Sequence, residues 1–221
     1  MLILGVDTSG KNGSIALVEF LAGSPRTLEI RPLEGGTFSA QLIPQIGALL
    51  VKHHLTKPEL DGFAVASGPG SFTGLRVGLA AIKALGEILS KPIAAVSLFE
   101  ATARAAGYPG SVVVGLDAGH GQVYAGLYGF ENGHSSCLDQ RLLSLVEFRS
   151  EFGAQPVVTS SPLLSREIPG STLIAQPKAD VIADLGFEKI QRGELVTPET
   201  LDASYVRASD AEIRRFKGEK P

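Results

Sequence analysis

Two stretches of similar design decide the fold of this chain: "LILGVDTSGKNGSIALVEF" at residues 2–20 and "VVVGLDAGHGQVYAGLYGF" at residues 112–130. In each, an apolar strand carries a glycine two places before an aspartate, turns on glycine-rich sequence and returns as a second apolar strand. The turns differ by two residues. Chance likeness between two hairpins is the alternative, but a repeated strand, turn and strand unit predicts two lobes of similar design.

The composition bounds the class of protein. The chain has 221 residues, of which 44% are hydrophobic and 19% charged, and it can form one domain or two small lobes. A net charge of -3 and a pI near 5.8 give no sign of independent nucleic-acid binding. The basic residues Arg214, Arg215, Lys217 and Lys220 are expected to form a solvated end.

One cysteine, Cys137, excludes an internal disulfide and a cysteine-based zinc site, and fits a reducing compartment. The first residues lack the pattern of a signal peptide, and no apolar run is long enough to span a membrane. We therefore expect a cytoplasmic protein with no membrane partner.

Periodicity and turn residues predict the elements of each lobe. The first lobe is expected to cover residues 1–107, and the second, smaller lobe residues 108–221 with a flexible tail from about residue 208. Beyond the two hairpins, strands are predicted at residues 27–33, 62–66, 93–96, 157–159 and 173–175. Helices are predicted at residues 39–54, 73–89, 97–106 and 179–192, the last of them in the second lobe.

The glycine-rich stretch "SGPGSFTGLRVG" at residues 67–78 is not a phosphate loop of a known type. It lacks the lysine of a Walker loop, its glycine spacing differs from the dinucleotide fingerprint, and Pro69 removes a backbone N–H donor. Ser71 or Thr73 can cap the helix that follows. An anion at the start of this helix stays open as an alternative.

The helix at residues 73–89 is apolar or small almost all round, apart from a narrow stripe of Arg76, Lys83 and Glu87. A helix of this kind is covered on two sides. One cover is the sheet, and the other is either a partner helix or the helix at residues 39–54 of the same chain.

The residues for chemistry are few. Asp7 and Asp117 end their strands, so they could hold a hydrated Mg²⁺ between the lobes, or cap the turns that follow. The four histidines make no pair at helical spacing, and no nucleophile motif is present. The catalytic and metal-ligating residue sets are therefore predicted to be empty.

Several motifs occur in the order typical of the bacterial TsaB family, which this chain resembles through about residues 2–130. They are "ILGVDTS", "SAQLIPQIGALL", "GFAVASGPGSFTGLRVGLAAIKAL", "DAGHGQVYAGLY" and the late "YVR". The resemblance implies an α/β, two-lobed fold of the actin-like and sugar-kinase-like type, which is ribonuclease H-like. It also implies a non-catalytic companion of TsaD, the enzyme that transfers threonylcarbamoyl to adenosine 37 of tRNA, with the ATPase TsaE as third component.

TsaD enzymes carry two metal-binding histidines on the helix that corresponds to residues 39–54, where this chain has "SAQLIP". In the family, the first-lobe helices pair with those of TsaD, or with a second copy of TsaB when TsaD is absent. The resemblance thus implies a partner surface made by Leu42, Ile43, Ile46, Leu50, Phe72, Leu75, Arg76, Leu79, Ala80 and Lys83.

The alternative is an ATPase or kinase with a nucleotide site at Asp7, Ser9 and Asp117, and a third hypothesis is a metallopeptidase. No cofactor is expected for the chain alone, and ATP with Mg²⁺ would bind only within the complex.

Overall fold

The computed structural model describes residues 1–131 and 134–204. The basic tail residues, the predicted boundary near residue 208 and the "YVR" motif lie outside the described residues.

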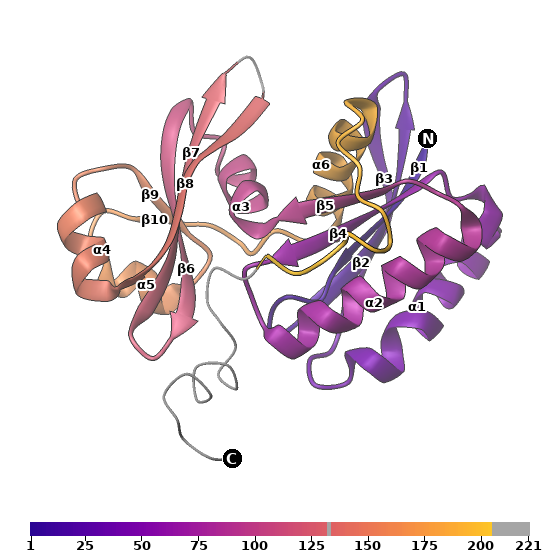
Figure 1. Ribbon diagram of the computed structural model, residues 1–221, viewed down its shortest axis with the longest axis horizontal. Helices are drawn as coiled ribbons and strands as arrows, with labels where there is room; N and C mark the ends of the chain where they lie inside the picture. The colour runs from indigo at the N-terminus through magenta and orange to yellow at the C-terminus, as the bar shows by residue number, and fades with distance from the viewer. Residues whose placement is uncertain (132–133, 205–221) are drawn as a thin grey trace.

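Two five-stranded sheets form the two lobes (Figure 1). The first has the order β3-β2-β1-β4-β5, and the second the order β10-β9-β6-β7-β8. The first sheet consists of β1 (Leu2–Asp7), β2 (Gly13–Leu21), β3 (Ser24–Leu33), β4 (Gly62–Gly68) and β5 (Ile93–Ser97). The second consists of β6 (Gly110–Gly119), β7 (Gln122–Glu131), β8 (His134–Ser144), β9 (Val157–Thr159) and β10 (Thr172–Leu173).

The repeated hairpins occupy the same place in the two sheets. β1 pairs antiparallel with β2 and parallel with β4, and β6 pairs antiparallel with β7 and parallel with β9. Asp7 lies opposite Ser14 and Asp117 opposite Val123, each near the turn of its hairpin. The two-lobed fold predicted from the repeat is confirmed.

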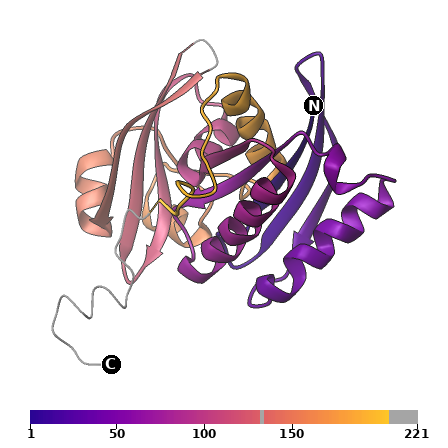
Figure 2. The same cartoon turned by 45° about the vertical axis from the view of Figure 1, so that its right-hand side comes forward.

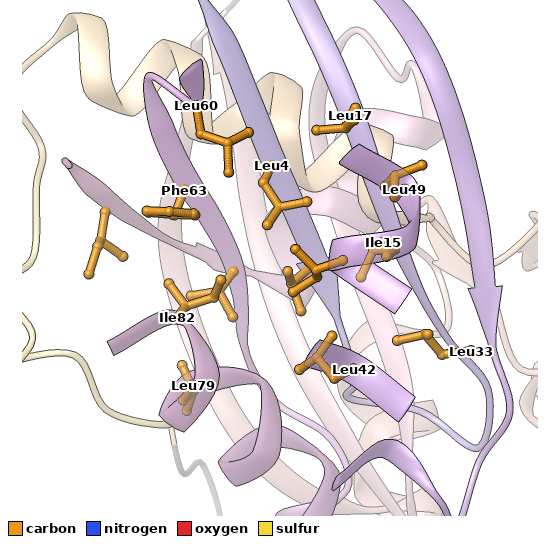
Figure 3. Close-up of a cluster of buried hydrophobic side chains, with 14 of the residues drawn as sticks. Leu4, Ile15, Leu17, Leu33, Leu42, Leu49, Leu60, Phe63, Leu79 and Ile82 are labelled. Carbon is orange, nitrogen blue, oxygen red and sulfur yellow. The ribbon is translucent and has the colours of Figure 1, made fainter. Parts of the chain in front are cut away.

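Two helices, α1 (Phe38–Lys52) and α2 (Phe72–Leu89), cover one face of the first sheet and lie beside each other (Figures 1 and 2). Leucine and isoleucine side chains from both helices meet alternate side chains of β1, β2 and β4 around Phe63 (Figure 3). Strand side chains alternate between the faces of a sheet, so only every second residue can reach these helices. This core contains Leu4, Ile15, Leu17, Leu33, Leu42, Leu49, Leu60, Phe63, Leu79 and Ile82.

The opposite face of the first sheet is covered by α6 (Ala179–Gln191), which packs against β1, β2, β4 and β5. The sequence placed this helix in the second lobe, and the structure corrects that assignment. A β-carbon at Gly5 would overlap the carbonyl oxygen of Ala179, and one at Gly186 would overlap the side chain of Ala64. The helix therefore returns to the first lobe because glycine and alanine let the backbones approach closely.

The chain after α6 stays with the first lobe. Val196 donates from its backbone N to the carbonyl of Ile93 (3.0 Å), and Ser204 donates to that of Ser67 (2.7 Å). Leu201 is fully buried and belongs to the same hydrophobic core as Leu42 and Leu79. The first sheet takes its strands from residues 2–97 and the second from residues 110–173, while residues 179–204 pack on the first sheet.

Three helices pack on the second sheet: α3 (Leu98–Ala106), α4 (Leu145–Phe152) and α5 (Pro162–Glu167). A short 3₁₀ turn, η1 (Lys57–Glu59), precedes β4. β8, α4 and α5 were not predicted from the sequence. The signal for α4 was present, because Ser144 and Glu147 form a capping box at its first turn.

Asp184 of α6 gives a testable pH dependence. Burial, with Asp180 and Glu188 nearby, raises the pKa of this carboxyl from 3.8 to about 6. Unfolding lets the group ionise, so the free energy of unfolding of the wild type falls as the pH rises from about 4 to 6. We expect Asp184→Asn to stabilise the protein by about 1–2 kcal/mol at neutral pH, after allowance for solvent screening of this half-buried group.

Urea unfolding at pH values above and below this window measures the effect, and the gain should vanish below about pH 4. Glu34→Gln, at an exposed carboxylate, is the matched control and should leave stability unchanged. An equal gain for Asp184→Asn at both pH values would contradict the raised pKa of Asp184 as its cause.

Candidate partner-binding surface and interlobe cleft

Half of the side chains predicted to contact a partner lie inside this chain's own core. They point at the first sheet, with exposed fractions of 3% or less. They belong to the apolar stripes whose spacing predicted the helices, and the burial that makes a stripe apolar also removes it from the surface. The prediction is therefore wrong for Leu42, Ile46, Leu50, Leu75 and Leu79.

The other predicted positions do reach the surface. Ile43 is 49% exposed, Arg76 and Ala80 are exposed, and Phe72 and Lys83 are half-buried. The Arg76 guanidinium lies 3.6 Å from the centre of the Phe72 ring, a cation–π arrangement that orders both side chains at the start of α2.

Exposed residues of the adjacent helices α1 and α2 lie on the side turned away from the first sheet, and we call them the outer helical face. Val51 is 74% exposed and Ile88 is 78% exposed, and four of the other eight members are alanines. Large apolar side chains of this exposure, in one patch among small residues, are typical of protein interaction sites. The outer helical face consists of Ala40, Ile43, Pro44, Ala48 and Val51 of α1 and Arg76, Ala80, Ala84, Glu87 and Ile88 of α2.

The flanks of α2 are covered by the chain itself. α1 lies along one flank, and Val77, Ala81, Leu85 and Leu89 of α2 pack against the first-lobe core, to which Leu201 belongs. The alternative that a helix of the same chain supplies the second cover is thus correct for the flanks. The outer helical face is the part of α2 that this chain leaves open.

The glycines before and within α2 serve close packing inside the chain. Thr8 donates from its hydroxyl to the carbonyl of Gly74 (2.8 Å), and β-carbons at Gly74 and Gly78 would overlap Thr8. Ser71 caps the helix by accepting from the backbone N of Gly74 (3.3 Å). The interpretation that this stretch brings α2 close to a partner is therefore wrong, because it brings α2 close to the turn after β1.

The cleft between the lobes contains a cavity of about 370 Å³, which we call the cleft cavity. Ser9 and Asp117 both line it, so the structure brings together two of the three residues of the predicted nucleotide site. Asp117 accepts a hydrogen bond from the backbone N of Gly119 (2.8 Å), which is the turn-capping role left open by the sequence.

Asp7 faces a different cavity. It lines a space of about 230 Å³ on the α6 side of the first sheet, and burial raises the pKa of its carboxyl. Because Asp7 and Asp117 do not share a cavity, their arrangement does not fit a magnesium ion held between the two carboxylates. Among the described residues, no three His, Cys, Asp or Glu side chains lie close enough together to hold a metal ion.

His53, the first histidine of the α1 region, belongs to a charged cluster at the end of that helix. Its Nε2 lies 2.9 Å from Oε2 of Glu29, and Lys52 contacts the same oxygen at 2.7 Å. The hydrogen bond from Lys52, followed by those from His53 and Arg31, lowers the pKa of Glu29 to about 2. These contacts tie the end of α1 to β3.

Comparison with known proteins gives consistent matches. A family model described as "TsaD: tRNA N6-adenosine threonylcarbamoyltransferase" matches residues 35–141, a range that includes α1 and α2. The tRNA threonylcarbamoyladenosine biosynthesis protein TsaB of Bacillus subtilis is 36% identical over 134 residues, which are 60% of this chain and 57% of that protein. The protein of the same name from Haemophilus influenzae is 32% identical over 127 residues, 56% of this chain and 52% of that protein.

The chain thus spans about half the length of these two relatives. Among solved structures, a protein from Pseudomonas aeruginosa described as similar to peptidase YeaZ superposes with a TM-score of 0.78. The two are 23% identical, and the match covers 93% of this chain and 99% of the other. YeaZ from the same organism superposes with a TM-score of 0.76, at 23% identity, over 92% of this chain and 99% of that one.

Two lobes built on repeated hairpin units, with α6 returning to the first sheet, define an α/β protein of the ribonuclease H-like, actin-like fold class. Within this class, the motifs of the first lobe and the curated relatives agree. Over 56–60% of its length, the chain is similar to curated proteins named TsaB. In the described part of the chain, every helix is too short or too polar to cross a lipid bilayer.

Proposed function

We propose that this chain is a non-catalytic subunit that binds and supports a TsaD-like paralogue in the threonylcarbamoyl modification of adenosine 37 in tRNA. The outer helical face is the observation that carries the proposal. It joins apolar side chains such as Ile43 and Val51 to small residues such as Ala80 and Ala84, on two adjacent helices. Small residues let the helices of a partner approach closely, so a pair of helices is the occupant that this surface suits best.

The charge on the outer helical face supports the same kind of partner. Arg76 and Glu87 are exposed on α2 and Lys83 is half-buried, and exposed apolar and small residues of α1 and α2 accompany them. Interfaces typically place apolar contacts at the centre and charges at the rim. The polar stripe of α2 is therefore expected to set the register of the partner, and the apolar and small residues to supply most of the buried area.

A role outside catalysis is supported by the residues of α1. The first turns of this helix carry serine, alanine and glutamine where the family resemblance implies metal-binding histidines in TsaD. His53 lies near the other end of the helix and contacts Glu29. We therefore assign catalysis of the threonylcarbamoyl transfer to the paralogue.

The remaining partners follow from the same role. A TsaE-like ATPase is the third component, ATP and Mg²⁺ bind within the complex, and a second copy of this chain occupies the outer helical face when the paralogue is absent. The chain does not bind nucleic acid on its own, and it works in the cytoplasm.

Reconstitution tests the function directly. The TsaD-like and TsaE-like proteins of the same organism are combined with tRNA, ATP and a threonylcarbamoyl donor, with and without this chain, and the modified nucleoside is measured by mass spectrometry. We expect modification only when this chain and the paralogue are both present. Equal modification without this chain, or modification by this chain without the paralogue, would overturn the proposal.

A further inference from the structure

The cavity that Asp7 faces has the chemistry of a ligand site, and we call it the α6 cavity. It lies where β1 ends, between β2, β3 and the segment that leads into α6, and its volume is about 230 Å³. Ligand sites for drug-sized molecules are larger, about 300–1,000 Å³, so the space suits a small molecule. The cleft cavity lies apart from it and has a different lining, with Asp117 and Tyr124.

The carboxylate of Asp7 is only half satisfied by the chain. Its side chain is 2% exposed, and Oδ1 accepts hydrogen bonds from the backbone N of Ser9 (2.9 Å) and from the Ser9 hydroxyl (2.5 Å). Within residues 1–131 and 134–204, Oδ2 accepts no hydrogen bond. Because Asp7 lines the cavity, Oδ2 is the oxygen left to accept a hydrogen bond from a cationic donor of a ligand.

The exposed end of the cavity, its mouth, carries a basic side chain instead of an acidic one. Lys178 is exposed and forms no ion pair within the described part of the chain, and Asn12 and Gln176 line the same cavity. Lys178 immediately precedes α6, whose N-terminal end favours negative charge. The backbone N of Ala179 donates to the hydroxyl of Ser14 (3.0 Å), so Ser14 holds this end of the helix at the cavity wall.

We propose that the α6 cavity binds a small α-amino acid as its zwitterion. The ammonium group donates to Asp7 at the buried end, and the carboxylate meets Lys178 and the two amides at the mouth. Ile30 and Pro32 of β3 supply an apolar wall for a short side chain. A ligand with a single charge would satisfy only one end of the cavity, and this proposal does not depend on the function proposed above.

Calorimetric titration of the full chain with glycine, alanine, serine, threonine and valine tests the proposal. We expect at least one of them to bind, and methylamine or acetate to bind at least about tenfold more weakly, because each offers one charged group. Asp7→Asn and Lys178→Ala should each weaken binding about tenfold or more. Lys57→Ala, at an exposed lysine of η1, is the matched control and should change nothing.

Lys178→Ala keeps the test decisive if Asp7→Asn disturbs the fold, because Lys178 lies at the surface. Absence of binding by all five amino acids would overturn the proposal, and so would binding that survives both substitutions. Loss of binding in Asp117→Asn, with no change in Lys178→Ala, would assign the ligand to the cleft cavity and would also overturn it.

Discussion

The substitution Ala84→Arg is expected to abolish binding of the TsaD-like paralogue while the chain stays folded. Ala84 is exposed on the outer helical face, so the free chain can accommodate an arginine there. In the complex, the guanidinium would be buried without a partner charge. A buried unpaired charge costs about 3–5 kcal/mol, which corresponds to a loss of affinity of at least about 100-fold.

Pull-down and calorimetry with the purified paralogue measure this loss, and thermal unfolding confirms that the variant is folded. Ala105→Arg is the matched control, because Ala105 is also an exposed helical alanine but belongs to α3. Ala81 is a poor probe, since it packs against the core of its own lobe. Unchanged affinity in a folded Ala84→Arg variant would show that the outer helical face does not bind the paralogue.

The substitution Gly5→Ala is expected to give the largest loss of stability. A β-carbon at this position of β1 would overlap the backbone carbonyl of Ala179, which no side-chain rotation can relieve. Overpacking of cores costs about 1–3 kcal/mol or more, and a clash with backbone belongs at the upper end of that range. We therefore expect a loss of about 3 kcal/mol or more in the free energy of unfolding, with displacement of α6 from the first sheet.

The same change at Gly47 should have the opposite sign. Gly47 lies inside α1, and a β-carbon there would meet nothing within 4 Å, so Gly47→Ala should stabilise the chain by about 0.5–1 kcal/mol. Urea unfolding of the two variants checks both signs. A stable Gly5→Ala variant with native protection of α6 in hydrogen exchange would contradict the close contact between the strand and this helix.

Local patterns predicted α1, α2, α3 and α6, the strands of the first lobe and the repeated hairpins. The first sheet has strands and helices close to the predicted residues, and Ser71, one of two predicted caps, is the one that caps α2. These features depend on periodicity and turn residues within a short window of sequence. A short window was therefore enough to predict them.

The position of α6 could not be predicted in this way. The contacts of Gly5 with Ala179 and of Ala64 with Gly186 join segments far apart in the sequence, and the helix itself has an ordinary amphipathic pattern. The residues that precede α6 in the sequence belong to the second lobe, and this favoured the wrong assignment of α6 to that lobe. β8 was missed because its residues are mostly polar, whereas the capping box of α4 was a readable signal.

In the candidate site too, some residues could be judged from the sequence and others only from the structure. The family resemblance implied Leu42 and Leu75 as partner residues, but both lie on the apolar face that each helix buries against its own sheet. Exposed apolar residues outside that face, such as Val51 and Ile88, became visible as a surface only in the structure. The repeat likewise did not predict that Asp7 and Asp117 line two different cavities, which only the structure shows.

Thiol labelling of the outer helical face tests the central claim most directly. Cys137 is the sole native cysteine and is exposed, so Cys137→Ser gives a background in which Ala84→Cys or Ala105→Cys places one reactive thiol at a chosen site. We expect saturating TsaD-like paralogue to slow thiol labelling at position 84 by about tenfold or more, and to leave the labelling rate at position 105 unchanged. Equal labelling at position 84 with and without the paralogue, in a mixture where the complex forms, would contradict this claim.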